Sequence, residues 1–578
     1  MRRRLLRIAI AAFAVWAALA LVWLVRTAMD LRAGRDAATA ARDQLGADQV
    51  ADGEPLPELR TAAARLGDAH DRAGGLLLAP LRVLPVVGRQ LRSVDALAGA
   101  AAEIARAGVD AVEEAQRVFA DPAGEGTARV EQVRLIAELV DDVATRLESI
   151  DDLGPREGLL GPLAEARNDL AADLADARSS LADARTGSRA ALSLVEGPRR
   201  YLVIAANNAE MRAGSGMWLS GGALTTVDGR LELEPMRSLH VDADPPTGAV
   251  APTGVLADMW GFLAPGDEWR NLMSSPTFPV SAELGARMWE AAGNGRVDGV
   301  LVVDAIGLQA IVAATGPVTV DGVSLTAEDI PQQVLHDQYL RYEDLANQFG
   351  QDNAERRESL AAIAGAAVAA IDKGDYPAST LIRELGEAIE GRHVLAWSRD
   401  ELEQAGWEAA GMSGELPEDG LLLSIQNRGT NKLDWFLDVE ADLSLERADE
   451  AWEVTVEVQL RNETPESEPR YVQGPGGAPG LPAGAYRGLV MLNAPSAARS
   501  LRVEMVERIA VTGEDGPTKV IGYSVDVARR ETATVTFRFE LPFSSRHLEV
   551  LASARVPTVT WRHGPSTRED SASWTAKW

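Results

Sequence analysis

The pattern of hydrophobic and polar positions changes several times along this chain, and each change predicts a different kind of structure. The first pattern is an uninterrupted apolar run from Ile8 to Val25, long enough to cross the hydrocarbon core of a membrane as a helix. Basic residues come directly before it, at Arg2, Arg3, Arg4 and Arg7. Because positive charge keeps that side in the cytoplasm, we expect residues 1–28 to form a basic tail and a single transmembrane helix, with the bulk of the chain extracytoplasmic.

A cleaved signal peptide is the alternative interpretation of this segment. No clean small-residue cleavage site precedes Arg26, and the run continues directly into polar helical sequence. We therefore favour an uncleaved, single-pass anchor in the cell membrane.

Residues 29–196 have the composition of a helical stalk, rich in Ala, Leu, Arg, Asp and Glu. Apolar residues recur there at spacings of three and four in two seams: Val130, Val133, Ala137, Val140, Ala144 and Leu147, then Leu163, Leu170, Leu174, Ala177, Leu181 and Ala184. Such seams predict antiparallel helix packing or a coiled coil.

The segment from Leu76 to Gly88 interrupts the stalk with an apolar run that contains Pro80 and Pro85. Two prolines exclude a regular second membrane span of ordinary length. The segment is either a hydrophobic elbow buried in the stalk or a surface that rests on the membrane. We expect the buried elbow, because an apolar patch of this size needs cover.

Short apolar runs rich in β-formers begin at Tyr201. Tyr201 to Ala206 predicts a central strand, and Ala223 to Val227 predicts a second strand before a hairpin at Asp228-Gly229. Pro235 to Val241 suggests another strand. The segment between the first two strands contains glycines that indicate a bend or a close approach: Gly214, Gly216, Gly221 and Gly222.

A strand, a helix and a further strand follow at Val297 to Asp304, Ile306 to Ala314 and Gly316 to Val320. This order predicts an α/β layer structure for residues 197–418. From Gly420 onward the hydrophobic pattern has a period of two, which predicts an antiparallel β-sandwich over residues 419–578. The expected fold class is therefore multidomain α+β, with a transmembrane helix, a helical stalk, a central α/β domain and a C-terminal β-sandwich.

Composition excludes several kinds of function. The net charge of −29 and the absence of a basic stripe argue against a nucleic-acid partner. The chain has no cysteine, so disulfides and zinc–thiolate sites are excluded. Its six histidines are scattered without an HExxH motif, so we expect no histidine metal site.

Candidate binding residues come directly after the predicted central strand, at Asn207, Asn208, Glu210 and Arg212. Open α/β sheets usually bind ligands at the ends of central strands. The alternative is that these four side chains satisfy turn backbone and form one structural ion pair.

Arginines are the second group of candidates: Arg341, Arg356 and Arg357. Guanidinium groups are natural bidentate partners of phosphate and carboxylate. The alternative is pairing with acids on solvated helix faces, where such pairs contribute little.

Two acidic residues and a later polar cluster complete the candidates. Asp242 and Asp244 project the same way on an extended segment and could bind a divalent cation such as Mg²⁺, although such pairs more often belong to turns. The segment from Asn427 to Trp435 could contact carbohydrate, or cap turns.

The order of these motifs resembles that of domain-of-unknown-function family 4012. The likeness rests on Tyr201 to Arg212, Asp228-Gly229, Val297 to Val300, Thr315 to Val318 and Trp397-Ser398, and it runs through most of the chain. Proteins of that family are membrane-anchored and common in actinobacterial envelopes. The resemblance implies a place in the cell envelope and brings no established reaction.

The central domain also resembles the LytR-CpsA-Psr family of extracytoplasmic phosphotransferases. These enzymes attach glycopolymers from polyprenyl-pyrophosphate carriers to the cell wall. Val297 to Val320 resembles that family's strand, helix and glycine segment. The resemblance matches the arginine and aspartate motifs of that family to Arg212, Arg237, Arg341, Asp352, Arg356 and Arg357 in this sequence.

Two departures from that family's pattern bear on catalysis. Gly214 to Gly216 stand where an aspartate is expected after Arg212, and Ser238 rather than aspartate follows Arg237. The loss of these carboxylates implies lost Mg²⁺ binding unless Asp242, Asp244 or Asp352 replaces them.

Two functional hypotheses follow. In the first, a membrane-anchored envelope protein binds, and could transfer, a polyprenyl-phosphate-linked glycan in wall or exopolysaccharide assembly; an enzymatic version would be a glycopolymer phosphotransferase, with no catalytic residue assigned. In the second, the protein is a non-enzymatic envelope scaffold or interaction protein. Arginines that converge beside an apolar tunnel would favour the first hypothesis.

Overall fold

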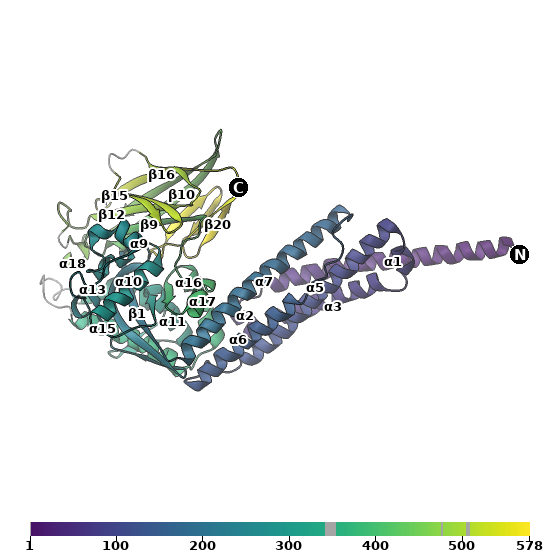
Figure 1. Ribbon diagram of the computed structural model, residues 1–578, viewed down its shortest axis with the longest axis horizontal. Helices are drawn as coiled ribbons and strands as arrows, with labels where there is room; N and C mark the ends of the chain where they lie inside the picture. The colour runs from purple at the N-terminus through teal and green to yellow at the C-terminus, as the bar shows by residue number, and fades with distance from the viewer. Residues whose placement is uncertain (1, 342–353, 476–477, 505–508) are drawn as a thin grey trace. The chain divides into compact units, whose positions relative to one another are not determined.

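The computed structural model describes residues 2–341, 354–475, 478–504 and 509–578 and divides the chain into two compact units (Figure 1). The first unit comprises Met1–Pro122, Glu131–Arg189 and Pro377–Arg383. The second comprises Ala123–Val130, Ala190–Tyr376 and Glu384–Trp578. All sheets of the described residues lie in the second unit, so the protein is mixed α+β.

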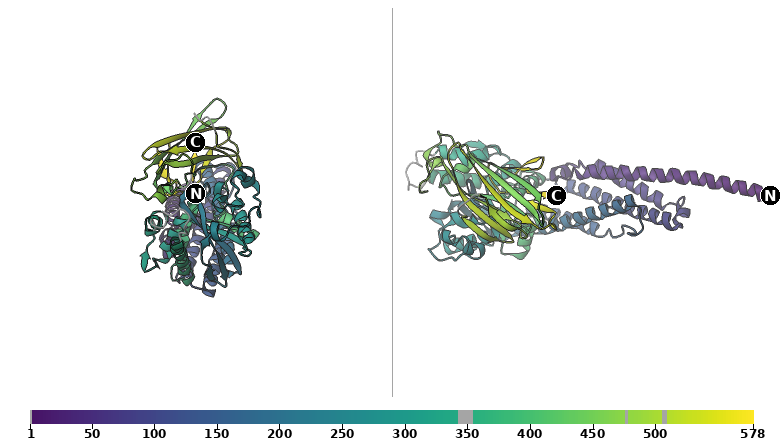
Figure 2. Two further views of the ribbon diagram at one scale, coloured as in Figure 1. Left: turned by 90° about the vertical axis from the view of Figure 1, so that its left-hand side faces the viewer. Right: turned by 90° about the horizontal axis from the view of Figure 1, so that it is seen from above.

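The N-terminal part of the chain is helical, as predicted. Its helices are α1 (Arg2–Arg42), α2 (Ala47–Asp52), α3 (Leu56–Gly74), α4 (Ala79–Arg82), α5 (Pro85–Val118), α6 (Thr127–Glu148) and α7 (Gly161–Glu196). Helix α1 is continuous in Figures 1 and 2, and from Ala14 onward it is long and apolar enough to cross a membrane or to act as a signal sequence.

The predicted helical seams close within the chain. Leu147 on α6 and Leu174 on α7 are buried in one cluster with Leu97 and Ala107 of α5, and Leu163, Leu170, Ala177 and Leu181 pack against it. The three-four spacing therefore serves helix packing inside a single copy.

The prediction that Leu76 to Gly88 is buried is wrong for most of the segment. Leu78 is buried, but Leu76 is 92% exposed and Val83 is 83% exposed. Both prolines open helices, α4 and α5, and the single turn of α4 is too short to cover the apolar side chains around it.

Strand β1 (Arg199–Met211) organises the main sheet of the second unit. It pairs antiparallel with β2 (Gly216–Val227) and parallel with β5 (Gly299–Val303). The strand order is β3-β2-β1-β5-β8, with β3 at Arg230–Leu233 and β8 at Val394–Ser398, and β4 (Arg237–Ser238) also pairs with β2.

Helices follow and flank these strands. They are α8 (Leu239–Asp242), α9 (Gly254–Asp258), α10 (Phe278–Ala291), α11 (Ala305–Thr315), α12 (Asp329–Gln332), α13 (Gln338–Arg341), α15 (Ala354–Lys373), α16 (Ala378–Glu390) and α17 (Glu401–Ala409), with short turns η1 (Gly261–Leu263), η2 (Trp269–Ser274) and η3 (Gln333–Asp337). The predicted strand and helix at 297–304 and 306–314 are confirmed as β5 and α11.

Three strand predictions need correction. The polar cluster does not follow the central strand but lies on it, because Asn207 is still paired with Met217 of β2. Pro235 to Val241 contains only the two-residue β4 before α8 begins. The strand near Val320 leaves the main sheet: β6 (Val318–Val320) pairs with β7 (Val323–Leu325), and β8 takes the place beside β5.

The period-two region forms two six-stranded sheets, ordered β13-β16-β11-β10-β18-β19 and β14-β15-β12-β9-β17-β20. Their strands are β9 (Gly420–Asn427), β10 (Leu437–Arg447), β11 (Trp452–Asn462), β12 (Tyr486–Ala494), β13 (Arg499–Val503), β14 (Val511–Asp515), β15 (Thr518–Val527), β16 (Thr532–Leu541), β17 (His547–Val550), β18 (Val559–His563), β19 (Ser566–Glu569) and β20 (Trp574–Lys577). The short segments η4 (Leu433–Phe436) and α18 (Arg470–Gln473) lie between strands.

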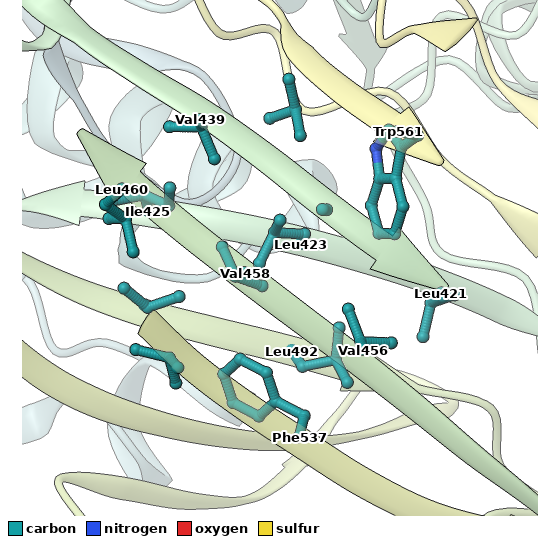
Figure 3. Packing of buried hydrophobic residues seen from close by; sticks show 14 of the residues in the cluster. Leu421, Leu423, Ile425, Val439, Val456, Val458, Leu460, Leu492, Phe537 and Trp561 are labelled. Carbon is teal, nitrogen blue, oxygen red and sulfur yellow. The ribbon is translucent and has the colours of Figure 1, made fainter. Parts of the chain in front are cut away.

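Residues of both sheets belong to one hydrophobic core. Leu423 and Ile425 of β9 lie close to Val456 and Val458 of β11, with Phe537 beside them (Figure 3). The pairing is not wholly antiparallel as predicted, because β18 and β17 return parallel to β10 and β9.

The carboxylate of Asp434, between β9 and β10, joins the main sheet to the two C-terminal sheets. Its Oδ1 accepts hydrogen bonds from Tyr486 Oη at 2.8 Å and Arg555 Nη1 at 3.0 Å. Its Oδ2 accepts from Asn427 Nδ2 at 2.8 Å and from the backbone N–H of Met211 at 3.1 Å. Both members of the Asp434–Arg555 pair are fully buried.

Arg555→Met should strongly destabilise the protein, by about 3–5 kcal/mol, because it leaves a buried carboxylate without its counter-charge. The measurement is urea unfolding of the full chain in detergent, followed by tryptophan fluorescence. The matched control is Arg562→Met, whose half-exposed guanidinium pairs with Glu440 at 2.6 Å and should leave the midpoint unchanged. Equal midpoints for the two variants would contradict the importance assigned to Asp434.

Candidate ligand-binding cavity

A cavity of about 810 Å³ lies beside one face of β1. Side chains alternate between the two faces of a strand, so Val203, Ala205 and Asn207 line the cavity. Leu202 does not line the cavity and belongs to the core that contains α10. The same alternation therefore builds a packed core on one face of β1 and an open space on the other.

Most of the cavity lining is aliphatic. Helices α11 and α15 pack on each other through Val312 and Ile363, and some of their other apolar side chains, such as Leu308, Ile311 and Leu360, line the space. The aliphatic lining comprises Val203, Leu219, Val303, Leu308, Ile311, Leu360, Ile363, Ala364, Ala367 and Val368. Such a wall suits an alkyl or isoprenoid chain.

A charged pair lies among these apolar walls. Lys432 Nζ contacts Glu210 Oε1, and both side chains are largely buried. Asn207 Nδ2 donates to Glu210 Oε1 at 3.2 Å and to Tyr339 Oη at 3.0 Å. Lys432 Nζ also lies 5.1 Å from the ring centroid of Tyr471. Burial alone would lower the pKa of Lys432, but the Glu210 carboxylate outweighs it and raises the pKa, so the lysine stays charged.

Arg270 and His240 extend the polar part of the lining. Arg270 Nε donates to Glu268 Oε1 at 2.8 Å, and this bond raises the pKa of Arg270 against the effect of burial. Burial favours a raised pKa for Glu268, but the bond to Arg270 lowers it overall. The two groups therefore remain ionised. Arg470 supplies a further guanidinium to the lining.

The cavity brings together two of the four candidates on β1. Asn207 and Glu210 line it, whereas Asn208 is buried and donates to Asp304 Oδ2 and to the carbonyl of Ala554, both at 2.8 Å. Asn208 is therefore a structural residue.

Arg212 is held by backbone carbonyls rather than by a cavity. Its Nε donates to the carbonyl of Arg270 at 2.8 Å, and its Nη1 donates to those of Met211 and Asn427, both at 3.0 Å. Burial lowers the pKa of Arg212 to about 10. This arginine ties β1 to β9.

Arg237 also lies outside the cavity lining. Its Nη1 donates to Asn294 Oδ1 at 3.0 Å, and its guanidinium lies 5.6 Å from the ring centroid of Trp289. The side chains of Arg341, Arg356 and Arg357 lie outside the described part of the structure, and Asp352 lies outside the described residues altogether.

The acidic pair at Asp242 and Asp244 is exposed. Asp242 Oδ2 accepts from the backbone N–H of Ser238 at 3.1 Å, which is a turn role. The pKa of Asp244 is raised by burial and by Glu268. Among the residues that the structure describes, no group of three or more acidic or histidine side chains could hold a metal ion.

The segment Asn427 to Trp435 is mostly structural. Asn427, Asn431 and Asp434 are buried and hydrogen-bonded to one another, and only Lys432 and Thr430 of this segment reach the cavity. Lys432, Arg270, Arg470, Tyr339 and Tyr471 were not predicted as members of one site. Nothing in their spacing could have grouped them, since folding alone brings β1, α13 and the β9–β10 turn together.

Residues 196–339 match the model of a family described as a protein of unknown function, DUF4012. The match supports the DUF4012 family for this segment of the chain. The matched segment begins at the last residue of α7, contains β1 to β7 and ends within α13. It is shorter than the resemblance expected from the sequence, which ran through most of the chain. No curated protein and no solved structure matches the chain.

Within the DUF4012 segment, Asp304 links the cavity lining to a buried corner of the C-terminal part. Its Oδ1 caps α11 by accepting from the N–H groups of Ile306 and Gly307 at 2.9 and 3.1 Å. Its Oδ2 bonds His393 Nδ1 at 2.7 Å. A second carboxylate, Asp570, is buried in the same region and accepts from Ser553 Oγ at 2.6 Å. Burial raises the pKa of Asp570 to about 7, although the Ser553 bonds and His393 oppose the shift.

Asp570 should make the protein less stable as pH rises. A carboxyl group whose pKa is higher in the folded chain than in the unfolded one binds its proton more tightly when folded, so stability falls between about pH 4 and pH 7. A shift of about three units corresponds to roughly 4 kcal/mol at most. The free energy of unfolding in urea should therefore decrease less between pH 5 and pH 8 for Asp570→Asn than for the wild type.

Asp442, a half-exposed carboxylate that pairs with Arg562 at 3.4 Å, provides the control. Asp442→Asn should retain the wild-type difference between pH 5 and pH 8. If the free energy of unfolding changed equally with pH in Asp570→Asn and in the wild type, Asp570 would not be the source of the pH dependence.

Proposed function

We propose that this protein is a membrane-anchored, extracytoplasmic cell-envelope protein that binds a polyprenyl-phosphate-linked glycan in its central cavity. The observation that carries the proposal is a largely aliphatic cavity of about 810 Å³ whose lining includes the buried Lys432 and the more exposed Arg270 and Arg470. Apolar pockets with a few convergent polar groups are the usual form of small-molecule sites.

The lining separates two kinds of contact. Aliphatic side chains of α11 and α15 offer no hydrogen-bond partner and suit the isoprenoid chain. Lys432, Arg270 and Arg470 offer positive charge for a phosphate. Glu210 and Glu268 now hold two of these cations, so a bound phosphate would share or replace those carboxylates.

The proposal also assigns the domains of the chain and the residues that could bind Mg²⁺. We take residues 197–418 as a LytR-CpsA-Psr-like α/β domain and residues 419–578 as a β-sandwich, with residues 1–28 and 29–196 as anchor and stalk. Glycan transfer would need Mg²⁺, for which Asp242, Asp244 or Asp352 are the candidate ligands. Binding alone needs none of them.

A scaffold role is the alternative, and the arginines favour it. Arg212 is committed to three backbone carbonyls, and Arg237 to Asn294 and Trp289, so neither supports phosphate binding. A protein of that class would link the membrane to envelope partners without a small ligand.

Binding of a fluorescent polyprenyl phosphate to the full chain in detergent tests the proposal. We expect saturable binding, weakened about tenfold by Ala364→Trp, because an indole on this face of α15 would fill part of the cavity. The matched control is Ala362→Trp on the same helix, which points to solvent and should bind as the wild type does.

The headgroup is tested with the polyprenol that lacks phosphate. The double variant Glu210→Gln with Lys432→Met keeps the net charge and should lose the preference for the phosphate over the alcohol. Absence of saturable binding by the wild type, or equal binding by the two tryptophan variants, would leave the scaffold as the better account.

A further inference from the structure

Apart from α1, the helical unit exposes a run of apolar side chains at one turn of the chain. Between α3 and α5, the apolar side chains of Leu76, Ala79, Pro80, Val83, Leu84, Pro85, Val86 and Val87 are exposed. Soluble surfaces seldom leave such a contiguous group uncovered. We call residues 76–87 the apolar elbow.

The apolar elbow packs against the apolar part of α1. Leu78 is buried with Ala20, and Trp16, Trp23 and Leu24 of α1 pack on the same cluster. The indole Nε1 of Trp16 donates to the carbonyl of Leu77 at 3.0 Å. The elbow therefore lies level with residues 16–24, inside the apolar run that could cross a membrane.

Several backbone N–H groups of the elbow have partners within the turn. The N–H groups of Leu78, Ala79 and Leu81 donate to carbonyls three residues earlier, and those of Leu84 and Gly88 also donate within the turn. Irregular backbone is tolerated at membrane depth only where such groups have partners. The pairing of these groups lowers the free-energy cost of placing the turn at membrane depth.

The single charged side chain of the elbow is directed back toward the helices. Arg82 donates to Asp95 Oδ2 at 2.6 Å and to the carbonyl of Ala73 at 2.7 Å. Its charge is therefore compensated on the side away from the exposed aliphatic groups. The nearest charged residues outside the elbow are Arg72, which pairs with Asp30 and Asp68, and the exposed Arg89.

We infer that the apolar elbow inserts into the lipid bilayer beside α1, as a second, non-spanning membrane contact. Trp16 lies nine residues before Val25, where the apolar run ends, so at 1.5 Å per residue the elbow reaches about 14 Å into the hydrocarbon. That depth is close to one leaflet. Asp30, bound to Arg65 at 3.1 Å and to Arg72, then lies outside the hydrocarbon.

Single cysteines test this inference directly, because the natural chain contains none. The full-length protein, with Val83→Cys or Val86→Cys labelled by an environment-sensitive fluorophore, is reconstituted into phosphatidylcholine–phosphatidylglycerol vesicles. Both labels should shift their emission to the blue and be quenched by lipids that carry a nitroxide on the acyl chain. Leu19→Cys, exposed on α1, gives the signal of a lipid-facing site.

The matched aqueous control is Leu45→Cys, an apolar and exposed position in the same unit but twenty residues beyond Val25. It should be quenched by iodide and not by the lipid nitroxide. Iodide quenching at 83 and 86 like that at 45 would overturn the inference. Shielding from both quenchers with energy transfer between labelled copies would also overturn it, since a second copy of the chain would then cover the elbow. Loss of α1 from the mature chain, read by N-terminal sequencing, would do the same.

Discussion

The second unit depends on one buried carboxylate. Asp434 accepts hydrogen bonds from Met211 at the end of β1, from Asn427 of β9 and from Tyr486 of β12, and it pairs with Arg555 from the C-terminal segment. Four parts of the chain that are distant in sequence therefore meet at two oxygen atoms. A fully buried charge is tolerated only when every such bond is made, so this network specifies how the main sheet meets the C-terminal sheets. Lys432, two residues earlier, owes its place beside Glu210 to the same turn.

The cavity follows from that arrangement. Strand β1 is covered by α10 on one face, and its other face is left to α11, α15 and the β9–β10 turn. These elements meet at their edges, through Val312 and Ile363 and through the Lys432–Glu210 pair, and leave the space between them open. Burying that pair in an apolar wall removes two charges from water, which costs free energy. Such a pair is therefore expected to have a role in structure or in binding. An aliphatic cavity with a retained charge is thus consistent with an amphipathic ligand.

The sequence predicted elements better than it predicted the site. Period-two and strand-helix patterns gave β1, β5, α11 and the C-terminal strands, because local side-chain alternation determines them. The sequence could not predict that β6 pairs with β7 outside the main sheet, because β8, far along the chain, takes the place beside β5. Nor could it predict that β17 and β18 run parallel to β9 and β10, because those strands are distant in sequence. Arg212 illustrates the same limit for the site: arginine is typical of phosphate binding, but its use for three backbone carbonyls depends on Arg270 and Asn427, far along the chain.

The elbow shows why exposed apolar residues must be judged with their polar neighbours. Hydrophobicity alone predicted burial of Leu76 to Gly88, because water disfavours such a surface. The structure instead pairs many of the polar groups of the turn: Arg82 is bound by Asp95, the Leu77 carbonyl by Trp16, and several N–H groups by nearby carbonyls. In water these bonds would be exchangeable with solvent and of small net value. In hydrocarbon each unpaired group would cost several kcal/mol, so internal pairing of a solvent-exposed turn is the arrangement that lipid, rather than water, requires.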